Sequence, residues 1–249
     1  MKLIITGATG YVATAVLRQA LLLPSITSVV AIARRSVSCP KSIPTANASK
    51  LKSIVVPAYD TYSRDVRREL EGANACIWTV AITPSKARQM APETVRMVCQ
   101  DWVVEGLKAI LEANPSPEQP LRFLYMSGSM AFDPARPRSR NKTIWIPSYI
   151  MEYSKMRGET ETQLLDIVAE NRTIAEVCIV KPGYISGKDL LNSIFGMLLS
   201  LTGLAETIHI NEVSAAMLHQ IVHGFEDSDG VLLNKELLII GKEAINLKK

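Results

Sequence analysis

A glycine-rich turn near the start of the chain is the first feature with an evident chemical use. Residues 6–13 read T-G-A-T-G-Y-V-A and follow the apolar run Leu3–Ile5. Gly7 permits a tight turn, Gly10 leaves room for a pyrophosphate, and the small Ala13 lets a helix pack against the strand. Free N–H groups at the start of that helix attract phosphate. We therefore interpret the turn as a dinucleotide-binding turn, with an ordinary glycine turn as the alternative.

Two arginines follow the second apolar run, Ser28–Ala33. Chains that bind NAD usually place Asp or Glu near the end of this strand to hold the ribose hydroxyls. Arg34 and Arg35 stand here instead, and a guanidinium suits a 2′-phosphate. We therefore predict NADP(H) as cofactor, with a solvent-exposed basic pair as the alternative. Further cofactor contacts are expected from the turn and from the ends of later strands: Thr9, Tyr11, Val12, Asp60, Val80 and Ala81.

A stripe of two tyrosines and an arginine lies on a later helix, predicted over Tyr149–Ala169. Tyr149, Tyr153 and Arg157 are spaced by four residues, so they share one helix face. Lys155 is two residues from Tyr153 and lies on the opposite side. A phenol with a pKa of about 10 needs a nearby cation to act as a base near neutral pH. The alternative is a helix surface without chemistry.

The scaffold that must position these residues is an alternation of apolar strands and helices, which implies parallel strand pairing. Parallel sheets bind ligands beyond the carboxyl ends of their strands, where these motifs lie. The predicted fold class is α/β, a Rossmann-type doubly wound parallel sheet with helices on both faces. We expect one domain over 1–249, with 183–235 contributing most of a small C-terminal lobe that faces the substrate. The predicted strands are Leu3–Ile5, Ser28–Ala33, Ser53–Val56, Ala75–Val80, Leu121–Met126, Ile174–Val180 and Glu236–Ile240, and the predicted helices are Tyr11–Leu23, Pro92–Ala113, Tyr149–Ala169 and Glu212–Gly224.

Composition excludes several classes of protein. The 249 residues are 47% hydrophobic and 21% charged, which is typical of a globular chain. A net charge of +4 is too small and too dispersed to indicate nucleic-acid binding. No signal peptide is evident, and the longest apolar stretch is interrupted and shorter than the roughly 20 residues of a membrane span. Four separated cysteines without a C-x-x-C pair suit a reducing compartment. We expect a cytoplasmic protein with neither nucleic-acid nor membrane partners.

Four motifs together resemble the short-chain dehydrogenase/reductase superfamily, in particular its atypical and extended members, the NmrA-like proteins and nucleotide-sugar epimerases. They are the N-terminal turn, L-Y-M-S-G-S at 124–129, Y-S-K-M-R-G-E-T-E at 153–161 and K-P-G-Y-I-S-G at 181–187. In that family a serine, a tyrosine and a lysine four residues after the tyrosine carry catalysis. The tyrosine moves a proton, the lysine lowers the pKa of the phenol and holds the nicotinamide ribose, and the serine orients the carbonyl.

The resemblance assigns these roles unevenly to this chain. Tyr153 matches the tyrosine, and Ser129 fits the serine better than Ser127 does. Arg157 stands where the family has lysine; it supplies positive charge but cannot release its proton. The resemblance also implies backbone contacts to the nicotinamide from a turn that comprises Pro182, Gly183 and Ile185 and ends at Gly187.

Three functions stay open. The first is an NADP(H)-dependent reductase of a carbonyl or iminium group in a small molecule. The second, motivated by the missing lysine, is a redox-neutral isomerase or cyclase, and the third is an NADP-sensing binding protein of the NmrA-like kind. The apolar segment Leu190–Leu204 is a core helix, a homodimer face or a wall above the nicotinamide, and the wall would imply an apolar substrate. The basic segment Asp133–Pro147 is a solvated loop or a lid over an anionic substrate. No metal is expected, because His219 and His223 share a helix face without a third ligand.

Overall fold

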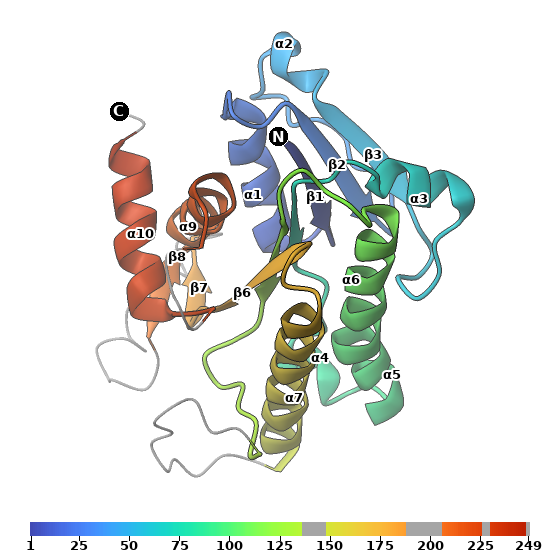
Figure 1. The fold of residues 1–249 in the computed structure, drawn as a ribbon. Helices are drawn as coiled ribbons and strands as arrows, with labels where there is room; N and C mark the ends of the chain where they lie inside the picture. The colour runs from blue at the N-terminus through green and yellow to red at the C-terminus, as the bar shows by residue number, and fades with distance from the viewer. Residues whose placement is uncertain (136–147, 188–205, 226–229, 248–249) are drawn as a thin grey trace.

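The computed structural model describes residues 1–135, 148–187, 206–225 and 230–247. Its centre is a seven-stranded sheet with the order β3-β2-β1-β4-β5-β6-β9, in which every neighbouring pair is parallel (Figure 1). This architecture confirms the predicted Rossmann-type α/β class. The strands are β1 (Lys2–Thr6), β2 (Ser28–Ala33), β3 (Leu51–Val55), β4 (Ala75–Trp78), β5 (Leu121–Met126), β6 (Ala175–Lys181) and β9 (Val231–Leu233).

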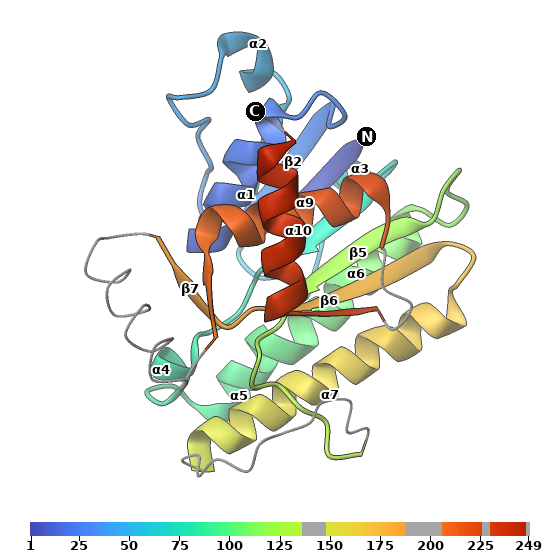
Figure 2. The same cartoon turned by 90° about the vertical axis from the view of Figure 1, so that its left-hand side faces the viewer.

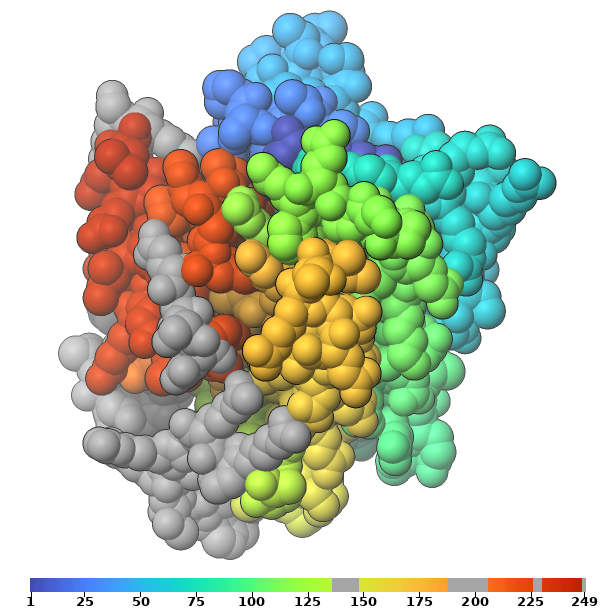
Figure 3. Space-filling view, in the orientation of Figure 1, coloured from blue at the N-terminus to red at the C-terminus, as the bar shows by residue number. Residues whose placement is uncertain are grey.

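Helices cover both faces of the sheet, and alternate strand residues serve the two layers. On one face α1 (Tyr11–Leu22) and α9 (Ile210–His223) pack over Leu3 and Ile5, with α10 (Asn234–Asn246) outside α9 (Figure 2). On the other face α6 (Trp102–Ala113) and α7 (Ser148–Glu170) pack over Ile4 and Phe123. Because successive strand residues point to opposite faces, each apolar strand feeds both cores. Figure 3 shows the end of α7 and the start of β6 between α6 on one side and the C-terminal helices on the other.

The short helices of the described chain lie mainly at the edges of this framework. They are α2 (Thr45–Ala48), α3 (Arg64–Leu70), α4 (Pro84–Ala87) and α5 (Pro92–Arg96). The first of them lies between β2 and β3. The strand predicted over Ala75–Val80 ends earlier, at Trp78.

The prediction of a last strand at Glu236–Ile240 is wrong, because this segment lies inside α10. Leu237, Gly241 and Ala244 are buried along it at spacings of four and three residues, which is a helical period. The short apolar run looked like a strand because its length and composition fit either element. The edge strand β9 lies directly before the helix and holds only three residues.

The structure is helical over all of Pro92–Ala113, as predicted, but a π-helical turn interrupts the α-helical geometry. Between α5 and α6 lies η1 (Met97–Asp101), a π-helical turn that buries Cys99 completely. Such turns inside helices are frequent at functional sites. The Cys99 Sγ accepts a hydrogen bond from the Ile82 N–H over 3.2 Å, so the π turn is held against the segment that follows β4.

The described part of the predicted C-terminal lobe is a small two-stranded parallel sheet. It consists of β7 (Tyr184–Ser186) and β8 (Thr207–His209). The apolar segment Leu190–Leu204 and residues 136–147 of the basic segment lie outside the described residues. Among the helices that are described, none has the length and apolar content needed to cross a bilayer.

Candidate functional site

The glycine turn has the backbone geometry that a pyrophosphate site needs. Gly7 has φ +66°, a conformation that favours glycine, and a Cβ there would lie 2.9 Å from Thr79 Oγ1. The Gly10 N–H donates to the Gly7 carbonyl over 2.7 Å, which closes the turn. Gly10 is the N-cap of α1 and offers no side-chain cap, and the first helical turn carries no acidic residue. The first N–H groups of α1 therefore suit an anionic ligand.

Tyr59 supports this turn, and the sequence did not suggest it. The Gly7 N–H donates to the Tyr59 hydroxyl over 3.2 Å, and that hydroxyl donates to the Ile32 carbonyl over 3.2 Å. Burial raises the pKa of Tyr59, whereas its Gly7 hydrogen bond and the nearby charge of Arg34 act in the opposite direction. The Ala8 N–H donates to the Ile32 carbonyl over 3.2 Å, so the end of β2, which Arg34 follows, lies close to the glycine turn. The signal that could have revealed Tyr59 is an aromatic residue with a polar tip directly after an apolar strand.

The two arginines after β2 are exposed at the same end of the sheet. Within the described chain, neither Arg34 nor Arg35 has a carboxylate within ion-pair distance. Asp60 is also exposed and follows Tyr59 directly. Positive charge, an open position and closeness to the glycine turn all fit a 2′-phosphate.

The remaining predicted cofactor residues fall into two groups around α1 and β4. Thr9 and Tyr11 are exposed, whereas Val12 is buried beneath them. Val80 packs near the position where a Gly7 Cβ would lie, and Ala81 is exposed beside it. The structure thus gathers the glycine turn and the end of β4, although the cofactor contacts themselves stay a prediction.

Tyr153 projects from α7 toward the segment after β4. Its hydroxyl donates to the Ile82 carbonyl over 2.8 Å. That segment begins at Thr79, which contacts the glycine turn, so the phenol and the turn lie at the end of the same strand. Burial raises the pKa of Tyr153 to about 12, although the nearby charge of Arg157 acts in the opposite direction. The phenol is therefore protonated near neutral pH, and its proton is directed at the Ile82 carbonyl.

Arg157 lies behind the phenol and is only 3% exposed. One Nη2 N–H donates to the Met126 carbonyl over 2.6 Å, and the guanidinium lies 4.7 Å from the centre of the Tyr125 ring. Its Nη1 is buried and has no hydrogen-bond partner among the described residues. A buried donor without a partner is uncommon, and a ribose hydroxyl would satisfy it. The ribose contact predicted for Arg157 stays a prediction, with Nη1 as the atom that would make it.

The two candidate serines have different surroundings. Ser127 is 8% exposed and its hydroxyl donates to Glu161 Oε1 over 2.5 Å. Ser129 is exposed, and in the described part of the chain its hydroxyl has no hydrogen-bond partner. The backbone N–H of Ser129 donates to the Pro182 carbonyl over 3.0 Å. Ser129 is therefore the serine whose hydroxyl is available to a ligand.

The nicotinamide turn predicted by the resemblance lies beside the serines. Pro182 is buried, and the Gly183 N–H donates to Asn234 Oδ1 over 2.8 Å. A Cβ at Gly183 would lie 2.0 Å from the Glu206 carbonyl oxygen, so only glycine fits. Ile185 is half-buried in β7. Sequence reasoning missed Asn234, because its partner is distant in the chain.

A cavity of about 610 Å³ opens between α4, α5 and α7, with Tyr153 in its wall. This volume lies in the range of small-molecule sites. Its lining combines apolar side chains with both signs of charge, and Arg88 lies 5.6 Å from the centre of the Tyr149 ring. The lining residues are Ala87, Arg88, Met90, Pro92, Val95, Arg96, Gln100, Tyr149, Glu152, Tyr153, Lys155, Met156 and Glu159.

No metal centre is evident in the described ranges, which contain no group of three or more His, Cys, Asp or Glu side chains that could hold an ion. His219 and His223 lie on one face of α9 with ring centres 4.4 Å apart. They line a separate apolar pocket between α1, α9 and α10.

Comparison with known proteins relates the chain to others through its fold. No protein-family profile and no curated protein sequence matches it. Vestitone reductase from alfalfa is 19% identical, with a TM-score of 0.61 over 93% of this chain and 76% of that one. A yeast methylglyoxal/isovaleraldehyde reductase solved with NADPH is 18% identical, with a TM-score of 0.61 over 94% and 77%.

Two further solved structures have a similar fold. The UDP-N-acetylglucosamine 4-epimerase from Methanobrevibacter ruminantium is 13% identical, with a TM-score of 0.64 over 93% of this chain and 75% of that one. The PhqB reductase domain from Penicillium fellutanum is 16% identical, with a TM-score of 0.61; the match covers 93% of this chain and 66% of that one. The chain therefore shares the fold of these reductases and of this epimerase.

Proposed function

We propose that this chain is an NADP(H)-dependent reductase that acts on a carbonyl or iminium group of a small molecule. One observation carries the proposal: the Tyr153 phenol and the glycine turn contact the same short segment after β4. A nucleotide held at the turn would extend along this end of the sheet, toward the phenol. A yeast methylglyoxal/isovaleraldehyde reductase solved with NADPH shares the fold, which is consistent with the proposal.

The chemistry assigned to the chain is proton delivery. The chemistry that NADPH would supply, when bound, is a hydride for the carbon of the C=O or C=N bond. Tyr153 donates its phenol proton to the oxygen or nitrogen that receives the electron pair of that bond. Ser129 orients this atom through its free hydroxyl, and the buried charge of Arg157 stabilises the phenolate that remains. Because guanidinium does not release its proton, the phenolate regains a proton from solvent.

The direct experiment is a search for turnover. Purified protein is incubated with NADPH and a panel of aldehydes, ketones, quinones and cyclic imines, and the fall in NADPH absorbance is followed. We expect at least one substrate to consume NADPH and yield its reduced product in equal amounts. Absence of NADPH consumption across such a panel would count against a reductase.

The cofactor preference is tested separately. We expect the double variant Arg34→Ala/Arg35→Ala to weaken NADPH binding at least tenfold, the equivalent of about 1.4 kcal/mol, while NADH binding changes little. Isothermal titration of both cofactors measures this, with Arg172→Ala, an exposed arginine before β6, as a matched control. Equal losses for NADPH and NADH would show that these arginines do not contact a 2′-phosphate.

A second candidate is a redox-neutral isomerase or cyclase on the same scaffold. The hydrogen bond of Arg157 to the Met126 carbonyl favours it, because the family's lysine proton relay is absent from this position. This function predicts turnover with NADP⁺ bound and no net change in absorbance. Loss of one NADPH per product would exclude an isomerase or cyclase. If the protein shows neither kind of turnover, NADP sensing is favoured instead.

A further inference from the structure

A buried ion pair joins α7 to the end of β6. Lys181 Nζ lies 2.9 Å from Glu161 Oε2, and the two residues are 5% and 7% exposed. Removing two charges from water is costly, and an apolar pair of the same size often stabilises a fold as well. The position of this pair therefore calls for a reason other than general stability.

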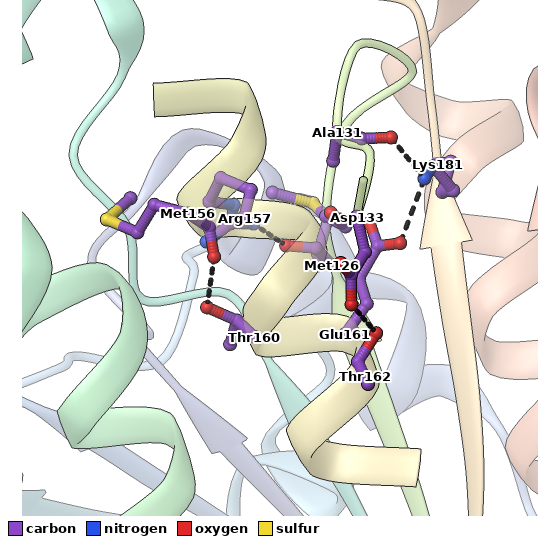
Figure 4. Close-up of polar contacts among 10 residues, drawn as sticks. Met126, Ala131, Asp133, Met156, Arg157, Thr160, Glu161, Thr162 and Lys181 are labelled. Carbon is purple, nitrogen blue, oxygen red and sulfur yellow. Dashed lines mark hydrogen bonds and ion pairs between the residues drawn. The ribbon is translucent and has the colours of Figure 1, made fainter. Parts of the chain in front are cut away.

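Both partners also hold the segment that follows β5. Lys181 Nζ donates to the Ala131 carbonyl over 2.7 Å, and Glu161 Oε1 accepts the Ser127 hydroxyl over 2.5 Å. Figure 4 shows Lys181 between the Ala131 carbonyl and the Glu161 carboxylate. A single pair thus links three elements: α7, β6 and the segment from Ser127 to Asp133, which we call the serine segment.

Further contacts fasten the serine segment along α7. The Phe132 N–H donates to the Ser154 carbonyl over 3.1 Å, and Thr162 Oγ1 donates to Asp133 Oδ2 over 2.6 Å. A Cβ at Gly158 would lie 2.0 Å from the Phe132 carbonyl carbon, so α7 touches this segment without an intervening side chain. The serine segment therefore runs alongside α7, the helix that carries Tyr153.

The same ion pair reaches the predicted nicotinamide turn. Lys181 directly precedes Pro182, whose carbonyl accepts the Ser129 N–H over 3.0 Å. The next residue, Gly183, is held by Asn234. Ser129 thus stands between two anchored points, the Ser127 hydroxyl on one side and the Ala131 carbonyl on the other.

We propose that the Glu161–Lys181 ion pair is a positioning device that fixes Ser129 and the Pro182–Gly183 turn relative to Tyr153. Ser127 is an anchor, because its proton is directed at Glu161 and away from any ligand. An apolar pair would not serve here, because it offers no donor to the Ala131 carbonyl and no acceptor to Ser127. The role of this positioning in catalysis rests on the proposed reductase function. The link that the ion pair makes between α7, β6 and the serine segment does not depend on that function.

Amide hydrogen exchange on the full chain tests the link. The variants Lys181→Met and Glu161→Gln each remove one charge with little change of shape, and Lys181→Arg restores a cation with several donors. The matched control is Lys108→Met, which breaks the exposed ion pair of Lys108 with Glu105 on α6, 3.0 Å long. Exchange is compared between the serine segment and the buried strand Leu3–Ile5, which reports opening of the whole molecule.

We expect Lys181→Met and Glu161→Gln to raise exchange in the serine segment about tenfold more than in Leu3–Ile5, the scale of a lost charge-assisted hydrogen bond. Lys181→Arg should restore most of the protection, and Lys108→Met should change neither region. Equal increases in both regions would mean that the pair supports only general stability and would overturn the proposal. Unchanged exchange in the serine segment would overturn it as well.

A milder variant and a titration complete the design. If Lys181→Met does not fold, Ser127→Ala removes one hydrogen bond to Glu161 and should raise exchange in the serine segment about fivefold. NADPH titration of Glu161→Gln should show weaker binding, because the Pro182–Gly183 turn is loosened. Unchanged NADPH affinity would overturn the part of the proposal that concerns this turn. Failure of the wild-type chain to bind NADPH would contradict the proposed function instead and leave the exchange result standing.

Discussion

The Tyr153 hydroxyl is the single group on which the proposed chemistry depends most. It faces a backbone carbonyl, and burial raises its pKa to about 12. A protonated phenol serves reduction, which needs an acid, better than oxidation, which needs a base. The spacing of Tyr153 and Arg157 could be predicted from sequence. The hydrogen bond from Arg157 to the Met126 carbonyl could not be predicted, because Met126 belongs to a strand that is distant in the sequence.

Replacing this phenol should abolish most of the turnover. We expect Tyr153→Phe to lower the rate of an established reduction by about 10²–10⁴-fold, the usual contribution of a positioned proton donor. NADPH affinity should stay within about twofold of wild type, because the predicted cofactor contacts lie elsewhere. Steady-state kinetics and titration measure both, with Tyr62→Phe at the edge of the α6-side core as the control. A variant with the wild-type rate would remove Tyr153 from the mechanism.

The raised pKa of Tyr153 also predicts how stability depends on pH. The folded chain holds this proton up to about pH 12, whereas the unfolded chain releases it near pH 10. The stabilisation is therefore complete below pH 10 and is lost as pH rises toward 12. Between pH 8 and 11 the free energy of unfolding should fall by about 1.4 kcal/mol more in wild type than in Tyr153→Phe. Urea denaturation at the two pH values measures this, and parallel losses would contradict it.

At the scale of elements, α7 packs closely against the serine segment. Gly158 lets the helix approach the serine segment directly. The sequence pattern could predict the bounds of α7 to within one residue at each end, because the helical pattern extends over many residues. The same pattern could not distinguish α10 from a strand, because the five residues Glu236–Ile240 are too few to separate a helical period from a strand period. It also could not reveal η1, because one extra residue in a turn leaves the apolar spacing almost unchanged.

An alanine at Gly158 tests this close approach. Glycine to alanine usually stabilises a helix interior, but here the added methyl group would overlap the Phe132 backbone. We expect Gly158→Ala to lower the free energy of unfolding by about 1–3 kcal/mol, as overpacking does. Urea denaturation measures the change, with the neighbouring, more exposed Glu159→Ala as control, expected within about 0.5 kcal/mol. A stabilised Gly158→Ala variant would show that the serine segment can move away.

At the scale of the whole molecule, the order of the parallel strands brings separate motifs to one edge. The glycine turn follows β1, the Ile82 segment follows β4, the serine segment follows β5 and the Pro182 turn follows β6. The sequence alone predicted this convergence, because parallel strands with helical crossovers all end on the same side. The buried pair of Glu161 and Lys181 could not be predicted from the sequence, because charged residues in a helix or at a strand end are usually exposed to solvent.

Cofactor binding should stabilise the folded molecule as a whole. At a concentration of about 100 times its dissociation constant, NADP⁺ should raise the free energy of unfolding by about 2.7 kcal/mol. For a chain of this size the melting temperature would rise by about 5–11 °C. NAD⁺ at the same concentration should give a smaller rise, measured by differential scanning fluorimetry. Equal rises for the two nucleotides would contradict the predicted preference, and no rise for either would contradict cofactor binding.

The central place of β1 in the sheet has a consequence for how the protein is made. β1 pairs with β2 on one side and with β4 on the other, and Ala75 follows Thr6 by 69 residues. At about 5–20 residues per second, a ribosome needs about 3–14 s to deliver the second partner. During that time one edge of an apolar strand is open to pairing with other nascent chains. The speed of translation between the codons for Thr6 and Ala75 should therefore influence how much of the protein reaches its folded form.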